Sequence, residues 1–121
     1  MEVILRLRAE GEAPLVDAGP DAVARSAGSR RANSHRKLGD TYFFWGHPDQ
    51  AWAEYETAAR HAVATEARAD LLLLAAESAL LAGQPAAARR LARESLAVVP
   101  DAGAARQFLA RLETPAPAEG H

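Results

Sequence analysis

The stretch from residue 35 to residue 63 reads HRKLGDTYFFWGHPDQAWAEYETAARHAV, and its spacing predicts two helices joined by a tight turn. Leu38, Gly39 and Tyr42 share one face of the first helix, where glycine lets a second helix approach closely. Gly46 marks the turn. The residues of the second helix that are expected to pack back are Ala51, Tyr55 and Ala58. This segment therefore predicts a helical hairpin.

The same turn recurs further along the chain. Residues 46–51 read GHPDQA, and residues 83–88, 37 positions later, read GQPAAA. In both, glycine supplies the permissive backbone that ends one helix, and proline fits the first turn of the next, where its missing N–H costs little. We therefore expect two helical hairpins in succession.

Composition favours helices and a single domain. The chain has 121 residues, of which 49% are hydrophobic, and these are mostly Ala and Leu with few β-branched side chains. There is no Cys, which excludes disulfides, thiolate metal sites and cysteine nucleophiles. Lys37 is the only lysine beside many arginines and alanines, a bias that indicates a GC-rich bacterial genome.

The N-terminal part predicts no further hairpin. Residues 1–32 are expected to form a leader that contains a short helix over 21–27 and a break at Gly28. Residues 3–7 alternate as in a short strand, which leaves a helix start, or an edge that pairs with another chain, as alternatives. No secretory signal is apparent, and the longest strongly apolar run, residues 71–76, is far shorter than the roughly 20 residues that cross a bilayer. We therefore expect a cytoplasmic protein.

After the second hairpin, the sequence predicts one more helix. Pro100 ends the hairpin, Asp101 can cap the helix that follows, and residues 102–113 carry an apolar stripe. The stripe consists of Phe108, Leu109 and Leu112. Residues 114–121 have no large apolar side chain and are expected to form a disordered tail.

Residues 33–113 resemble the tetratricopeptide repeat family, on the strength of the first hairpin and the recurring turn. The resemblance places repeats at about 33–65 and 69–102 and a capping helix at 102–113. It implies an all-α fold in which the hairpins form a short right-handed α-solenoid. Because that repeat is about 34 residues long, the spacing of 37 predicts extra residues near 62–67 and a long second helix in the first repeat. Such proteins are generally non-catalytic scaffolds for protein binding.

The resemblance also implies a ligand-binding face on the first helix of each repeat. In the first repeat this face comprises Asn33, Arg36, Lys37, Asp40, Phe43 and Phe44. In the second it comprises Asp70, Leu73, Leu74, Glu77, Leu80 and Leu81. Aromatic and leucine side chains beside acids predict a groove for an apolar or amphipathic helix, from a partner protein or a second copy, whose basic residues the acids select. The alternative is that these leucines only pack against the capping helix and the neighbouring repeat.

A basic stretch supports an alternative function. Residues 22–39 contain five basic and no acidic residues, so they carry +5 while the rest of the chain carries −7. The segment from Arg25 to Lys37 could bind phosphates as part of a nucleic-acid-associated accessory protein, dock onto the acidic remainder of another copy, or form a solvated surface. Because the helical phase scatters these charges around the axis, we expect a protein partner rather than nucleic acid or a membrane.

No pattern predicts catalysis. The histidines, which are far apart and form no metal-binding motif, are His35, His47, His61 and His121. The glycines occur singly rather than in a phosphate-binding loop. Trp45 and Trp52 flank the first turn, where packing is the expected role rather than a ligand cage. We therefore expect no enzyme activity, no metal and no cofactor.

Overall fold

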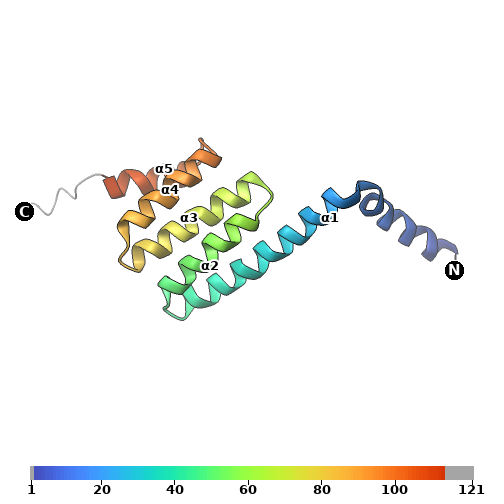
Figure 1. Cartoon of the computed structure of the whole chain (residues 1–121), viewed down its shortest axis with the longest axis horizontal. Helices are drawn as coiled ribbons and strands as arrows, with labels where there is room; N and C mark the ends of the chain where they lie inside the picture. The colour runs from blue at the N-terminus through green and yellow to red at the C-terminus, as the bar shows by residue number, and fades with distance from the viewer. Residues whose placement is uncertain (1, 114–121) are drawn as a thin grey trace, which may run out of the picture.

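The computed structural model describes the backbone of residues 2–113 and the side chains of residues 20–113 (Figure 1). It contains five helices, and no strand occurs among the described residues. The helices are α1 (Glu2–Phe44), α2 (Pro48–His61), α3 (Thr65–Leu81), α4 (Pro85–Val98) and α5 (Gly103–Glu113). The predicted all-α class is confirmed. The tail predicted over residues 114–121 lies outside the described residues.

Two turns of the same geometry connect α1 to α2 and α3 to α4. Gly46 and Gly83 have φ angles of 82° and 80°, in the left-handed region that glycine adopts without steric cost. The N–H of the residue after each glycine donates to a carbonyl five residues earlier, at 2.8 Å in the first turn and 2.9 Å in the second. Pro48 and Pro85 then begin α2 and α4, which are both 14 residues long. The predicted recurrence of the turn is therefore confirmed.

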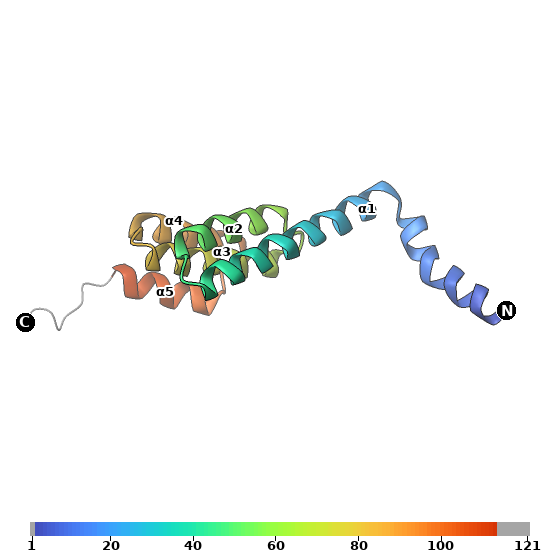
Figure 2. The ribbon, with the colours of Figure 1, turned by 90° about the horizontal axis from the view of Figure 1, so that it is seen from below.

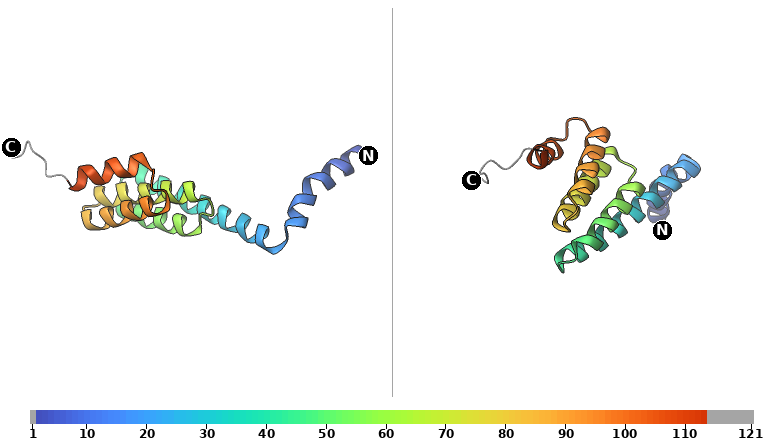
Figure 3. Two further views of the ribbon diagram at one scale, coloured as in Figure 1. Left: turned by 90° about the horizontal axis from the view of Figure 1, so that it is seen from above. Right: turned by 60° about the vertical axis from the view of Figure 1, so that its left-hand side comes forward.

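Each helix packs against the next one along the chain, so the body is a row of helices in sequence order (Figure 3). Small residues form much of its core: Ala51 on α2 and Ala75 on α3 are fully buried. Gly39 on α1 lies against the ring of Tyr55, at a distance that would place an added Cβ 2.8 Å from the ring. Small side chains at these positions allow the close approach of helices on which this row depends.

The first helix is longer than the sequence predicted. α1 is continuous from Glu2 to Phe44, so the expected break at Gly28 and the strand-like reading of residues 3–7 are wrong. Its N-terminal part projects beyond the other helices and bends (Figure 2), which is expected of a helix with prolines in its interior. Gly28 is needed for contact instead, because an added Cβ there would lie 3.1 Å from the His61 carbonyl oxygen. The segment expected as a leader, residues 1–32, thus continues into the first hairpin.

The extra residues of the first hairpin lie near residues 62–67, as predicted, but they do not lengthen its second helix. α2 ends at His61 and has the same length as α4, so the predicted lengthening of the second helix is wrong. Residues 62–64 form a short connection, and α3 begins at Thr65 rather than near Ala69. The additional residues therefore give α3 an extra first turn.

The last helix covers one end of the row. Phe108 and Leu109 of α5 are buried in the common core, and Leu112 packs against it, as the stripe predicted. Arg93 on α4 bonds Glu113 at 2.6 Å, which ties the end of α5 to its neighbour. The helix expected at residues 102–113 is therefore present, with its start displaced by one residue.

Candidate functional site

Three charged residues of the predicted ligand face converge on one tyrosine. Tyr55 of α2, which packs between α1 and α3, donates a hydrogen bond from its hydroxyl to the Asp40 carboxylate on α1. Arg36 on α1 and Glu77 on α3 lie close enough to act on the same hydroxyl electrostatically. Asp40 therefore contacts Tyr55 directly, while Arg36 and Glu77 lie near the hydroxyl from α1 and α3 with no hydrogen bond to it among the described residues.

Burial governs ionisation at this point. Tyr55 is 3% exposed, and burial, followed by the hydrogen bond to Asp40, raises the pKa of its hydroxyl well above the ordinary value. Burial also raises the pKa of Glu77, an effect that the Arg111 guanidinium on α5 partly offsets. The charged forms of Tyr55 and Glu77 are therefore both disfavoured here. Tyr55 remains a neutral hydrogen-bond donor.

The apolar members of the predicted face differ in exposure. Leu73 and Leu74 are half-buried against the core, which fits the packing interpretation for these two residues. In contrast, Phe44 is 81% exposed and Leu81 is 64% exposed, and Phe43 is 45% exposed. Large apolar side chains at the ends of α1 and α3 are therefore exposed to solvent.

The face extends onto α5, which sequence reasoning missed. Leu80 on α3 lines a cavity of about 350 Å³ together with Phe108, Arg111 and Leu112 of α5. Packing of α5 on the leucines of α3 was only the alternative in the sequence analysis, and the residues that face the cavity depend on the angle between the two helices. Arg111 therefore joins the surroundings of Glu77 without a local pattern that could have identified it.

Other predicted residues stand apart from this convergence. Asn33, Lys37 and Asp70 are exposed, and their side chains form no hydrogen bond or ion pair with another residue in the described part of the chain. Trp45 was expected to pack, but it is 70% exposed, with its ring edge-on to Phe44 at 5.9 Å. The surface at the C-terminal ends of α1 and α3 is thus more apolar than the sequence predicted.

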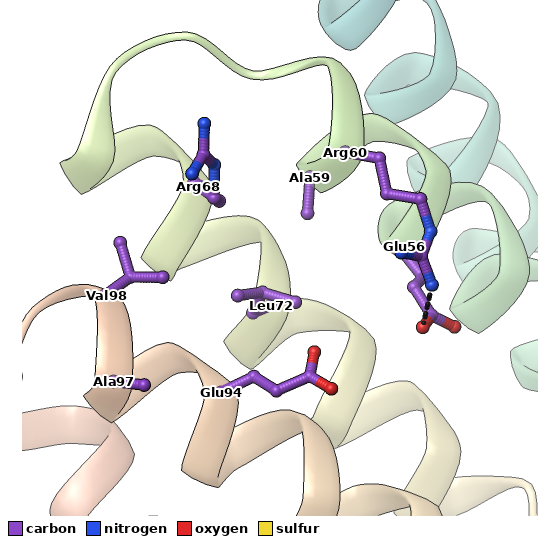
Figure 4. Close-up of a pocket in the computed structure, with 8 residues that line it drawn as sticks. All are labelled: Glu56, Ala59, Arg60, Arg68, Leu72, Glu94, Ala97 and Val98. Atoms are coloured by element: carbon purple, nitrogen blue, oxygen red, sulfur yellow. Dashed lines mark hydrogen bonds and ion pairs between the residues drawn. The ribbon is translucent and has the colours of Figure 1, made fainter.

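A second cavity lies on another side of α3, and the sequence analysis did not identify it. It has a volume of about 570 Å³ and opens between α2, α3 and α4 (Figure 4). Its lining residues, which define the α2–α4 pocket, are Glu56, Ala59, Arg60, Arg68, Leu72, Glu94, Ala97 and Val98. Leu72 and Glu77 are five residues apart, so their side chains are turned by about 140° around the helix axis. The pocket and the predicted face therefore use different sides of α3.

Ion pairs close one end of the α2–α4 pocket. Glu56 on α2 bonds Arg60 at 2.8 Å and Arg90 of α4 at 3.4 Å. Arg90 also bonds Glu94 at 3.1 Å, so it links the two walls. Burial lowers the pKa of the Arg90 guanidinium. The carboxylates of Glu94 and Glu56 together have the larger effect, so this pKa is raised overall. The acids of this pocket are therefore already neutralised by neighbouring arginines.

Arg68 stands at the other end without a carboxylate partner among the described residues. Its Nη2 donates to the Ala62 carbonyl at 3.0 Å, whereas its Nε is buried and has no hydrogen-bond partner. Arg106 makes the same contact after the second hairpin, from Nη2 to the Pro100 carbonyl at 2.9 Å, but it is exposed and lies outside the pocket. A buried donor without a partner is uncommon in folded proteins. Arg68 therefore differs from Arg106 in having a buried donor without a partner.

One sequence feature, the spacing between the two turns, is related to the position of this pocket. The two turns are 37 residues apart, and the structure places the additional residues in the connection and in the first turn of α3. Arg68 lies on that extra turn and reaches back to the connection at Ala62. An irregular spacing between otherwise matched hairpins therefore indicated where the regular packing would be interrupted.

Histidines and carboxylates form a small link between α1 and α2. His35 and His61 stack with ring centroids 5.7 Å apart, and Nδ1 of His35 lies 2.7 Å from a Glu54 carboxylate oxygen. In the residues that the structure describes, no group of three or more His, Cys, Asp or Glu side chains could hold a metal ion. We therefore assign this contact to helix packing.

Comparison with known proteins identifies no family for the chain. No family model matches it, and neither curated proteins nor solved structures match it. Within residues 2–113, no helix combines the length and apolar character needed to span a membrane. The function must therefore be inferred from the two surfaces of the molecule.

Proposed function

We propose that the chain is a non-catalytic, cytoplasmic protein-interaction module that binds a helix or peptide of another protein, or of a second copy, on the face formed by α1 and α3. The observation that carries the proposal is the exposure of large apolar side chains at the ends of α1 and α3, close to Asp40 and Glu77. Exposed Phe44 and Leu81 each stand one helical turn beyond one of these acids. The same pairing of an acid with an apolar residue therefore occurs on both helices.

The position of Glu77 supports a binding role. Glu77 is exposed on α3, and partial desolvation of its carboxylate raises its pKa. An acid held under such conditions is a candidate functional group. Exposed apolar side chains beside it are typical of an interaction surface.

We further propose that the two hairpins are successive units of a short right-handed solenoid of the tetratricopeptide type. The equal lengths of α2 and α4, and the matching φ angles of Gly46 and Gly83, support a true structural repeat. Packing of each helix on the next also fits a solenoid, in which each unit contacts only its neighbours. In that arrangement α1 and α3 present one continuous surface.

The chemistry of the face favours a basic amphipathic helix as the partner. Apolar side chains of the partner would cover Phe44 and Leu81, while its Lys or Arg residues would approach Asp40 and Glu77. The acids would contribute mainly to selectivity and to the rate of association, because one is already hydrogen-bonded and both lie near arginines.

A capture experiment with the full chain tests this proposal. The chain is immobilised, and partners from the source cells are quantified by mass spectrometry for the unchanged protein and for Phe44→Ala and Leu81→Ala. Each change should reduce capture about fivefold or more, as expected when an apolar anchor worth about 1 kcal/mol is lost, with unchanged helicity by circular dichroism. Val63→Ala is the matched control, since Val63 is 40% exposed but lies in the connection after α2.

The basic stretch of α1 defines the competing outcome. Arg25, Arg30 and Arg31 are exposed and form no ion pair with another described residue, which favours nucleic acid as the second candidate partner. Under that function, Arg30→Ala and Arg31→Ala would abolish capture, and binding would fall steeply with added salt. Full capture by the Phe44 and Leu81 variants, together with that salt dependence, would replace the proposed function by nucleic-acid binding.

A further inference from the structure

We infer that the α2–α4 pocket binds a small molecule that has an apolar chain and a single carboxylate. The inference does not depend on the α1–α3 face, because the pocket lies on another side of α3. Its volume of about 570 Å³ is within the range of roughly 300–1,000 Å³ that is typical of small-molecule sites. Its lining combines apolar side chains with a few polar groups, as such sites do.

Arg68 is the group that would receive the carboxylate. A guanidinium has five N–H donors and binds a carboxylate through two parallel hydrogen bonds. Arg68 uses one donor on the Ala62 carbonyl, and its buried Nε remains without a partner. The contact with Ala62 also fixes the guanidinium before a ligand arrives, so less side-chain freedom is lost on binding.

The net charge of the pocket favours a monoanion. Its two glutamates are balanced by Arg60 and Arg90, which leaves the single positive charge of Arg68. A ligand with two negative charges would carry one more charge than this single positive charge balances. A single carboxylate bound at Arg68 therefore balances the charge of the pocket better than a doubly charged phosphate would.

The remaining lining would hold the apolar chain. Figure 4 shows Leu72 on α3 between the walls formed by α2 and α4, with Val98 on the side of α4. Ala59 and Ala97 complete the apolar part and leave space because their side chains are small. A ligand anchored at Arg68 could therefore lay an aliphatic chain across Leu72.

The competing explanation is that Arg68 only fastens the connection between α2 and α3. Arg106 provides the comparison, because it makes the equivalent contact to a carbonyl six residues earlier while lying outside the pocket. A purely structural role would make the two arginines equivalent. If Arg68 binds a ligand, its replacement should weaken ligand binding, whereas replacement of Arg106 should not.

Nuclear magnetic resonance titration of the full chain tests the inference, with sodium octanoate as the probe and octanamide as its uncharged control. Octanoate should give a saturable shift of the Arg68 Nε–H resonance and of the Leu72 methyl groups. Octanamide should bind at least about tenfold more weakly, because it lacks the charge that strengthens the hydrogen bonds. Arg68→Lys should weaken octanoate binding at least about tenfold, whereas Arg106→Lys should leave it unchanged.

Equal binding of octanoate and octanamide, equal loss in the two lysine variants, or the absence of a saturable shift would each overturn the inference. Should Arg68→Lys prevent folding, the comparison of octanoate with octanamide on the unchanged chain decides the question alone. None of these measurements involves Phe44 or Leu81, so their outcome is separate from that of partner capture on the α1–α3 face.

Discussion

Replacing Gly39 by alanine should destabilise the protein even though alanine is the better helix former. An added Cβ would lie 2.8 Å from two atoms of the Tyr55 ring, which is shorter than a carbon contact allows. The ring cannot move aside easily, because it is 3% exposed and its hydroxyl is bonded to Asp40. Overpacking of this kind costs about 1–3 kcal/mol, while the exchange of glycine for alanine within a helix gains about 1 kcal/mol. The free energy of unfolding should therefore fall by up to about 2 kcal/mol.

Gly103→Ala is the control for this substitution. Gly103 begins α5, and an added Cβ there would have no other atom within 4 Å. It should therefore keep or raise stability through helix propensity alone. Because both variants share the gain in helix propensity, urea unfolding followed by circular dichroism should rank Gly39→Ala below Gly103→Ala by the overpacking cost alone, about 1–3 kcal/mol. A Gly39 variant as stable as the control would refute the close packing of α1 on Tyr55.

Four further predictions concern stability. Above pH 10, the ordinary tyrosine pKa, the unfolded chain loses the Tyr55 proton that the folded protein retains, so stability should fall with rising pH, and Tyr55→Phe should reduce this loss in urea titrations. The raised pKa of Glu77 makes its contribution to stability decline as pH rises from 4.5, so Glu77→Gln should be at least as stable at pH 7 while it weakens capture of a basic partner; a less stable variant would contradict this. Ser95→Ala should cost about 1 kcal/mol because its buried hydroxyl donates to an α3 carbonyl at 2.8 Å, whereas Ser78→Ala, which removes a buried hydroxyl without a partner, should cost nothing in the same thermal melts. Deleting residues 102–121 removes α5 from the core and should abolish cooperative unfolding in calorimetry; an unchanged melting temperature would show that α5 is dispensable.

Local chemistry explains which parts of the fold could be predicted. The turns at Gly46 and Gly83 depend on the residues within a few positions of each glycine, and these are visible in the sequence. The apolar stripe of α5 is likewise a matter of helical periodicity, and Phe108 and Leu109 are buried as expected. Features that repeat within one or two helical turns were therefore predictable.

Features that depend on tertiary contact were not predictable. A glycine at position 28 favours a helix break, yet α1 is continuous there and packs against the end of α2. The convergence at Tyr55 joins residues from three helices, and it appears only when α2 lies between α1 and α3. The α2–α4 pocket similarly depends on how far apart two helices stand, which no local pattern records.

The irregular spacing of the hairpins connects these two surfaces. The turns at Gly46 and Gly83 lie next to the exposed ends of α1 and α3, whereas the extra residues lie at the other end of α3, beside Arg68. Asp40 and Glu77 each lie six residues before the glycine of the turn that follows, so the additional residues at the start of α3 leave this spacing the same in both hairpins. The proposed ligand pocket and the proposed partner face therefore involve opposite ends of α3. Because both surfaces share α3, a ligand that orders the first turn of this helix would be expected to stabilise the partner face as well.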